Sequence, residues 1–250
     1  KEPDSMRVLY PSCKSVEHLT NGSTLGRKTK KGEWVNWVGP PHDELLDQFM
    51  AAAVRSKWAV EKPLAEMTPS WAEMTARFVA TPPGDPPRTL LAGVCNYRDP
   101  TSSSHRPLHF YCGVREDEMN EIRLDHPADV WLSMKLVSRQ HQRFDPEAAC
   151  EEAVEWIGMA SRKHRTIIAQ LKAAKIDPDK SSALLFAAMR SGLVASARLK
   201  SIDDLLRGGE QTGWELIKAF AAVARLSPPQ DQPGFCVRFS RMVRQELGIN

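Results

Sequence analysis

The chain has 250 residues and a formal net charge of +3, with 42% hydrophobic and 26% charged residues. Such a composition is typical of a soluble globular protein that can bury a core. No run of about 18 apolar residues occurs, which excludes a membrane-spanning helix. Residues 1–150 carry 19 Lys and Arg against 20 Asp and Glu, whereas residues 151–250 carry 15 against 11. The mild basic excess, too small to indicate nucleic acid by itself, therefore lies in the carboxyl-terminal part.

The cysteines are odd in number, scattered and never spaced as CxxC: Cys13, Cys95, Cys112, Cys150 and Cys236. This pattern argues against a disulfide framework and against a four-cysteine zinc site. It predicts a reducing compartment, and we expect the cytoplasm. The sequence starts at Lys1 and its first methionine is Met6, so a targeting segment stays an open alternative.

The first elements alternate between loops and short regular segments. Residues 26–32 (GRKTKKG) form a basic stretch bounded by glycines, which we interpret as a loop, and residues 34–38 (WVNWV) predict a short strand. Residues 43–57 predict an amphipathic helix. Thr68 as N-cap and Pro69 at the first helical position predict the start of another helix. This helix would end at the proline-rich residues 81–87.

Two strands are predicted in the middle of the chain. Residues 89–97 (TLLAGVCNY) and 108–114 (LHFYCGV) are rich in β-branched, aromatic and apolar types, and a turn composition at 99–104 separates them. They predict an antiparallel hairpin. Residues 130–137 predict a helix.

The rest of the chain predicts helices. Asp145 and Pro146 have the types of a helix start, and the helix should end before Asp177-Pro178. Residues 181–190, stopped by Gly192, and a segment beginning at Ser201 follow. A capping box at Thr212 and Glu215 begins the helix 216–226, and the last helix spans 235–247 before Gly248. We therefore predict an α+β fold, with a mixed region 1–144 that holds a small antiparallel sheet and a helical region 145–250, unless the two form one continuous domain.

The long helix carries an apolar repeat in steps of three and four: Cys150, Ala153, Ile157, Ala160, His164, Ile167, Leu171 and Ala174. Such a seam is suited to packing against other helices, including those of a second copy of the chain. His164 on the seam has two interpretations. It is either a polar, pH-sensitive contact that sets helix register, or, more commonly, a core histidine with one hydrogen-bonding neighbour.

Sequence signatures of common enzymes do not occur: GxxxxGK[ST], GxGxxG, GxSxG and HExxH are all missing. Their absence favours a binding protein over an enzyme, and we expect no cofactor.

Two clusters could carry chemistry, and both have simpler structural interpretations. Cys95, His105, His109 and Cys112 lie within 18 residues, but His109 and Cys112 would point to opposite faces of one strand, so packed or surface residues are favoured over a metal site. Asp125, His126 and Asp129 could include a general base, but acids at such a place more often form the turn and cap of the helix that follows.

Two basic patches favour nucleic acid. The first is the loop with Arg27, Lys28, Lys30 and Lys31, followed by Trp34 and Trp37. Cations neutralise phosphates and indole rings stack on bases, although the two tryptophans would point to opposite faces of one strand. The second patch has helical spacing on the last helix: Arg238, Arg241 and Arg244. The alternative interpretation of both patches is a solvated surface.

The order of segments 181–192, 199–206 and 212–223 resembles the carboxyl-terminal end of a phage- and plasmid-associated protein family of unassigned function. That family has a similar Thr-x-Trp-x-Leu-x-x-Ala-Phe segment, here residues 212–220, and a central strand pair similar to residues 90–112. The resemblance covers about residues 88–247, although Lys218 and Ala221 stand where asparagine and threonine are expected. It implies a mobile-element or viral context and no activity.

These observations lead to three hypotheses. The first is a nucleic-acid-binding protein of a phage or plasmid that binds single strands as an oligomer. The second is a protein–protein interaction module, an inhibitor or adaptor, that acts through its helical face. The third is an enzyme with a site near His105, His109, Asp125 and His126.

Overall fold

The computed structural model describes residues 26–28, 34–36, 42–67, 73–84, 89–97, 108–116, 128–137, 145–206 and 211–249. The chain forms two compact units, the first from Lys1–Tyr111 and Lys135–Gly158, the second from Cys112–Met134 and Met159–Asn250. Each unit takes residues from both sides of position 144/145. The division predicted there stays a prediction.

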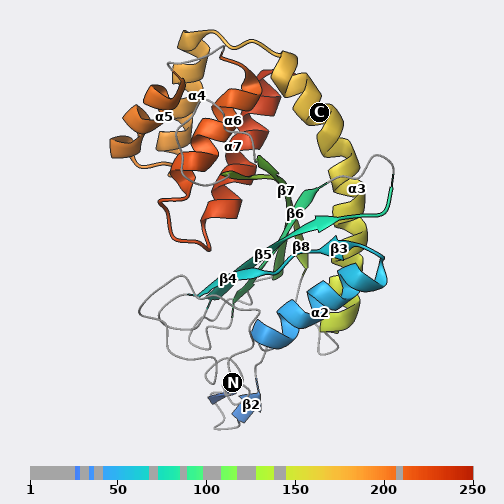
Figure 1. Cartoon of the computed structure of the whole chain (residues 1–250). Helices are drawn as coiled ribbons and strands as arrows, with labels where there is room; N and C mark the ends of the chain where they lie inside the picture. The colour runs from blue at the N-terminus through green and yellow to red at the C-terminus, as the bar shows by residue number, and fades with distance from the viewer. Residues whose placement is uncertain are drawn as a thin grey trace. The chain divides into compact units, whose positions relative to one another are not determined.

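The fold is α+β, as the sequence predicts, with an antiparallel sheet of six strands and helices before and after it (Figure 1). Along the sheet the strands follow the order β3 (Ala59–Val60), β5 (Glu73–Thr81), β6 (Leu90–Tyr97), β7 (Leu108–Glu116) and β8 (Ala128–Val137), and β4 (Leu64–Met67) also pairs with β5. The predicted strands 89–97 and 108–114 are therefore neighbours, as β6 and β7. A separate antiparallel pair is formed by β1 (Gly26–Lys28) and β2 (Trp34–Asn36).

Three predictions of local structure are wrong. Residues 130–137 lie in β8 and not in a helix, and residues 73–80, which the sequence placed in a helix after Pro69, lie in β5. The segment at 26–28, interpreted as loop, is β1. β5 pairs with β3, β4 and β6, and β8 lies beside β7 in the sheet. Tertiary pairing here outweighs local propensity.

In the first unit, α2 (His42–Arg55) packs on one face of the sheet. The ring of Phe49 lies 5.0 Å from that of Phe78 on β5 and 5.1 Å from that of Phe110 on β7, measured between centroids. His42 Nδ1 lies 3.0 Å from Asn96 Nδ2 on β6. Because side chains alternate along a strand, Phe78, Phe110 and Asn96 define the face that α2 covers.

The helix α3 (Pro146–Ala173) begins as predicted, with the Asp145 carboxylate accepting hydrogen bonds from the Glu147 and Ala148 backbone amides at 2.9 and 3.3 Å. Its first part contacts α2, since Arg55 forms ion pairs with Glu147 and Glu151 at 3.1 and 3.0 Å. These exposed pairs contribute little to stability.

The predicted seam of α3 is buried from Cys150 to Leu171, with the side chains at most 9% exposed. Cys150 contacts the Leu45 carbonyl in the first unit, and His164 contacts Cys112 in the second. Ala174 follows the end of the helix and is partly exposed. Since the seam already packs inside its own chain, self-association would need a different surface of α3.

In the second unit, α4 (Pro178–Arg190), η2 (Ser196–Arg198), α5 (Leu199–Leu206), α6 (Gly213–Ala224) and α7 (Gln232–Glu246) gather into one helical group (Figure 1). The Phe220 ring of α6 and the Phe239 ring of α7 are stacked, with centroids 4.0 Å apart. Gly192 and Gly248 have φ of +69° and +66°, which is why these predicted stops need glycine.

The helix starts also follow local signals. Asp177 caps α4 by accepting from the Asp179 amide at 2.8 Å, so Asp177-Pro178 both stops one helix and starts the next. Thr212 caps α6 by accepting from the Glu215 amide at 3.2 Å. A capping box would have the Glu215 carboxylate accept from the Thr212 backbone amide. In the structure this carboxylate instead forms an ion pair with Lys218 at 2.9 Å. None of the helices in the described part of the chain has the length and apolarity to cross a membrane.

Candidate functional site

The predicted amino-terminal basic patch is described only through its backbone. Arg27 and Lys28 lie in β1 and Trp34 in β2, where Lys28 pairs in register with Trp34. Lys30, Lys31 and Trp37 lie outside the described residues. The pairing of β1 with β2 thus places Lys28 of the predicted basic patch opposite Trp34, one of the two tryptophans of that patch.

The second predicted patch is on α7, and we call Arg238, Arg241 and Arg244 the arginine stripe. Steps of three residues place them along one side of the helix. Arg238 and Arg241 are exposed, and Arg244 is partly buried. The Arg238 guanidinium lies 5.2 Å from the centroid of the Phe235 ring, and its Nε donates to the Gly234 carbonyl at 3.4 Å. The stripe therefore presents positive charge to solvent from a well-packed helix.

The charges of the stripe are not balanced locally. Burial, followed by the Arg241 charge, lowers the pKa of Arg244. Burial, followed by the Arg244 charge, lowers the pKa of His164 on α3 from 6.5 to about 4. Among the described residues no carboxylate pairs with Arg241 or Arg244, and Glu246 pairs with Lys180 at 3.1 Å instead. A group of like charges without a partner acid is suited to bind an anion.

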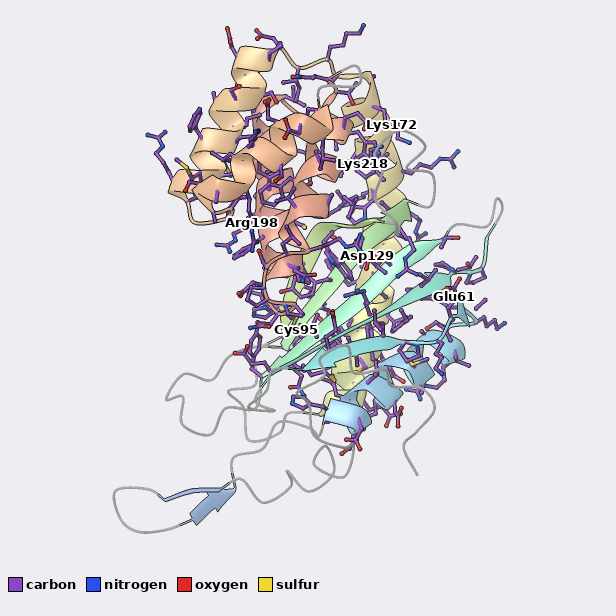
Figure 2. The ribbon with its side chains drawn as sticks, turned by 60° about the vertical axis from the view of Figure 1, so that its left-hand side comes forward. Glu61, Cys95, Asp129, Lys172, Arg198 and Lys218 are labelled. Carbon is purple, nitrogen blue, oxygen red and sulfur yellow. The ribbon has the colours of Figure 1, made fainter. Side chains whose placement is uncertain are left out.

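The helices of this unit carry its positive charge. Residues 159–250 hold 15 Lys and Arg against 8 Asp and Glu, whereas residues 112–134 of the same unit hold 2 against 6. Figure 2 labels three of the helical cations, and each already has a contact. Arg198 donates to the Leu226 carbonyl at 2.8 Å, Lys218 pairs with Glu215, and Lys172 lies 5.9 Å from the Trp214 ring. In the stripe, Arg238 also has contacts, with the Phe235 ring and the Gly234 carbonyl, whereas no carboxylate among the described residues pairs with Arg241 or Arg244.

A second group of polar side chains lies on the sheet of the first unit, on the side opposite α2. The register pairs Thr75 with Cys95, whose side chains are 3.2 Å apart, and this fixes which residues share that side. We call this set the polar face: Glu66, Glu73, Thr75, Arg77, Cys95, Tyr97, His109 and Tyr111. Cys95 is labelled in Figure 2 on β6.

Several members of the polar face contact one another. Arg77 and Glu66 form an ion pair of 2.8 Å, with side chains 17% and 9% exposed. The His109 ring lies 5.3 Å from that of Tyr97, and His109 Nδ1 lies 3.1 Å from Tyr111 Oη. The sequence-based reasoning missed this face because it read residues 73–77 as helix. Their alternation of polar with apolar types was the signal for a strand.

The predicted chemical clusters are only partly described. His105, Asp125 and His126 lie outside the described residues. His109 and Cys112 are on opposite sides of β7, as expected, and no group of three or more His, Cys, Asp or Glu in the described part of the chain could hold a metal ion. Asp129 pairs with Arg115 at 3.1 Å and lies in β8, so its predicted role as a helix cap is wrong.

His164, singled out by its place on the seam, is 3% exposed and lies with its Nδ1 3.6 Å from Cys112 Sγ. Cys112 and Cys150 are buried as well, and burial raises the pKa of both thiols, for Cys150 to about 12. These thiols are therefore protonated and poor nucleophiles near neutral pH.

Comparisons with protein families, with curated proteins and with solved structures found no match to this chain.

Proposed function

We propose that this chain is a nucleic-acid-binding protein that contacts phosphates through the arginine stripe of α7. The observation that carries the proposal is the exposure of Arg238 and Arg241 beside Arg244, with no partner carboxylate for Arg241 or Arg244 among the described residues. Arginine binds phosphate with a planar fork of donors and keeps its charge at any physiological pH. Three such groups on one side of a helix can neutralise successive backbone phosphates.

Two further observations support the proposal. The excess of positive charge on residues 159–250 gives a field that attracts polyanions to the helical unit. The pairing of Lys28 with Trp34 in β1 and β2 puts a phosphate-binding and a base-stacking residue type side by side in one ladder. A preference for single strands rests on the tryptophans, and a phage or plasmid context and a cytoplasmic location rest on the sequence.

The test is fluorescence anisotropy of labelled single- and double-stranded oligonucleotides at low salt. We expect binding by the natural chain and loss of about a hundredfold or more in affinity for Arg238→Gln/Arg241→Gln, because each of the two charged contacts contributes about 1.5 kcal/mol or more. The matched control is Arg190→Gln/Lys200→Gln, which removes two exposed charges from other elements of the same unit. Equal affinity of the two variants would contradict a role for the stripe.

A second candidate function is a protein–protein interaction module. Phe186 on α4 and Leu226 beside α6 are 55% and 65% exposed, and exposed apolar side chains are available for contacts with another protein. Co-purification with a stoichiometric protein partner, lost in Phe186→Ser, and no binding to oligonucleotides at low salt would favour this function over the first.

A further inference from the structure

Helix α3 separates its charges into an acidic and a basic half. It holds four glutamates and no lysine or arginine from Pro146 to Gly158, and four lysines or arginines and no acid from Met159 to Ala173. Acids near the start of a helix and cations near its end interact favourably with the helix dipole, but this effect falls off within the first and last turns. Glu155 and Arg162 lie near the middle of α3, so the dipole does not account for them.

This separation places like charges next to each other on the surface of α3. Glu151 and Glu155 are four residues apart and Arg162 and Arg165 are three apart, and at these spacings like charges repel each other. Arg55 pairs with Glu151 at 3.0 Å and Lys135 with Glu152 at 2.6 Å. Glu155, Lys163 and Arg165 have no ion pair among the described residues. Part of the charge of α3 is therefore left without a counter-charge in its own chain.

The charged residues lie on the side of α3 opposite its buried seam, which we call the outer face. Glu155 and Arg162 are seven residues apart, close to two full turns, so both point outward along one line. On one flank of this line lie Glu152 and Lys163, and on the other lie Glu151 and Arg165. All six residues are exposed, and so is Met159 between the two halves, at 48%.

We infer that the outer face of α3 binds the same face of a second copy of the chain, with the two helices antiparallel. A two-fold axis then places Glu155 of one copy against Arg162 of the other, and each such contact occurs twice. On the flanks, Glu152 meets Lys163 and Glu151 meets Arg165. The three pairs have the same midpoint to within one residue, at Gly158, so one axis satisfies all of them. A parallel arrangement would instead bring like charges together.

The geometry of α3 is sufficient for this contact. The helix is continuous from Pro146 to Ala173, and the stretch from Glu151 to Arg165 is about 21 Å long. Met159 lies beside the axis, so the methionines of the two copies cover each other. Arg162 also has an interaction in its own chain, and the five N–H donors of a guanidinium allow a further partner. The contact uses neither the seam nor the arginine stripe of α7, and it needs no nucleic acid.

The test is sedimentation velocity of the nuclease-treated chain, from micromolar to near-millimolar concentration, at low and high salt. We expect a monomer–dimer equilibrium that shifts to monomer as salt rises, because exposed ion pairs are screened. Glu155→Lys and Arg162→Glu should each raise the dimer dissociation constant about tenfold or more, because each turns two attractive contacts into repulsive ones. An equimolar mixture of the two variants should restore the dimer, because every contact beside the axis then joins opposite charges.

The matched controls reverse exposed charges outside α3. Glu61→Lys, at the position labelled in Figure 2, and Lys200→Glu should keep the natural dissociation constant. A natural chain that stays monomeric, or that dimerises only before nuclease treatment, overturns the pairing. A dimer that both folded variants retain, or that their mixture does not restore, overturns the assignment to this face. If Arg162→Glu does not fold, Glu152→Lys and Lys163→Glu make the same exchange on one flank, and failure of their mixture to restore the dimer overturns it equally.

Discussion

The substitution Gly113→Ala tests the pairing of β7 with β8, which the sequence did not predict. A Cβ at Gly113 would lie 2.3 Å from the Val130 carbonyl oxygen and 3.0 Å from the Trp131 Cα. These are main-chain atoms of the neighbouring strand, so they cannot rotate away as a side chain could. Overpacking costs about 1–3 kcal/mol, and we expect about 3 kcal/mol because the obstacle is backbone. For a chain of this size that lowers Tm by about 6–12 °C.

Gly158→Ala is the matched control with the opposite expected sign. Gly158 lies inside α3, and a Cβ there would meet only Trp58 Cζ2 at 3.5 Å, an ordinary contact. Alanine favours the helix by about 0.8–1 kcal/mol over glycine, so Tm should rise slightly. Urea denaturation and thermal melting followed by circular dichroism measure both effects. A Gly113→Ala chain as stable as the natural one would refute the pairing and leave residues 130–137 available for a helix.

Three further predictions concern stability. The folded-state pKa of His164, about 4, lies below the ordinary 6.5, so the unfolded chain binds the proton first as pH falls. The free energy of unfolding therefore does not depend on this titration above pH 6.5, and it decreases by about 3 kcal/mol between pH 6.5 and 4. His164→Leu should remove this pH dependence, which urea denaturation at a series of pH values measures. Thr212→Ala removes the α6 cap and should lower the unfolding free energy by about 1 kcal/mol, with no change in the urea m-value. Arg77→Leu leaves the Glu66 carboxylate buried without its ion-pair partner and should cost about 3 kcal/mol, most of it recovered when Glu66→Leu is added. A double variant no more stable than Arg77→Leu would contradict this.

The helical elements could be predicted because their signals are local. Asp145, Thr212, Gly192 and Gly248 each act within one turn of the helix that they begin or end, and the structure places them at those ends. The seam of α3 was visible because its period is that of a helix and every member up to Leu171 is buried. No knowledge of the rest of the fold was needed for these elements.

The strands β5 and β8 could not be separated from helices by local pattern. Residues 73–81 include Met74, Ala76 and Ala80, which favour helices, and they become a strand because β3, β4 and β6 all pair with them. Residues 130–132 are consecutive and all buried, a pattern that a short run shares with a buried helix. Gly113 lets the backbones of β7 and β8 approach each other closely, and this favours the strand. Gly113 lies 17 residues before Val130, so a local sequence pattern around Val130 does not include it.

The candidate site was predicted in part for the same reason. The spacing of Arg238, Arg241 and Arg244 was legible on one helix, as was the place of His164 on another. That His164 lies close enough to Arg244 for their charges to interact depends on how α3 and α7 pack, which no local pattern encodes.

The measurement that tests the central proposal most directly is the salt dependence of oligonucleotide affinity. If Arg238 and Arg241 each neutralise a phosphate, the slope of log K against log salt should fall in magnitude by about 1.4 for single strands or about 1.8 for duplex in Arg238→Gln/Arg241→Gln. The control Arg190→Gln/Lys200→Gln should keep the natural slope. Equal slopes for the two variants, or no binding by the natural chain at low salt, would contradict the assignment of α7 as the phosphate-binding helix.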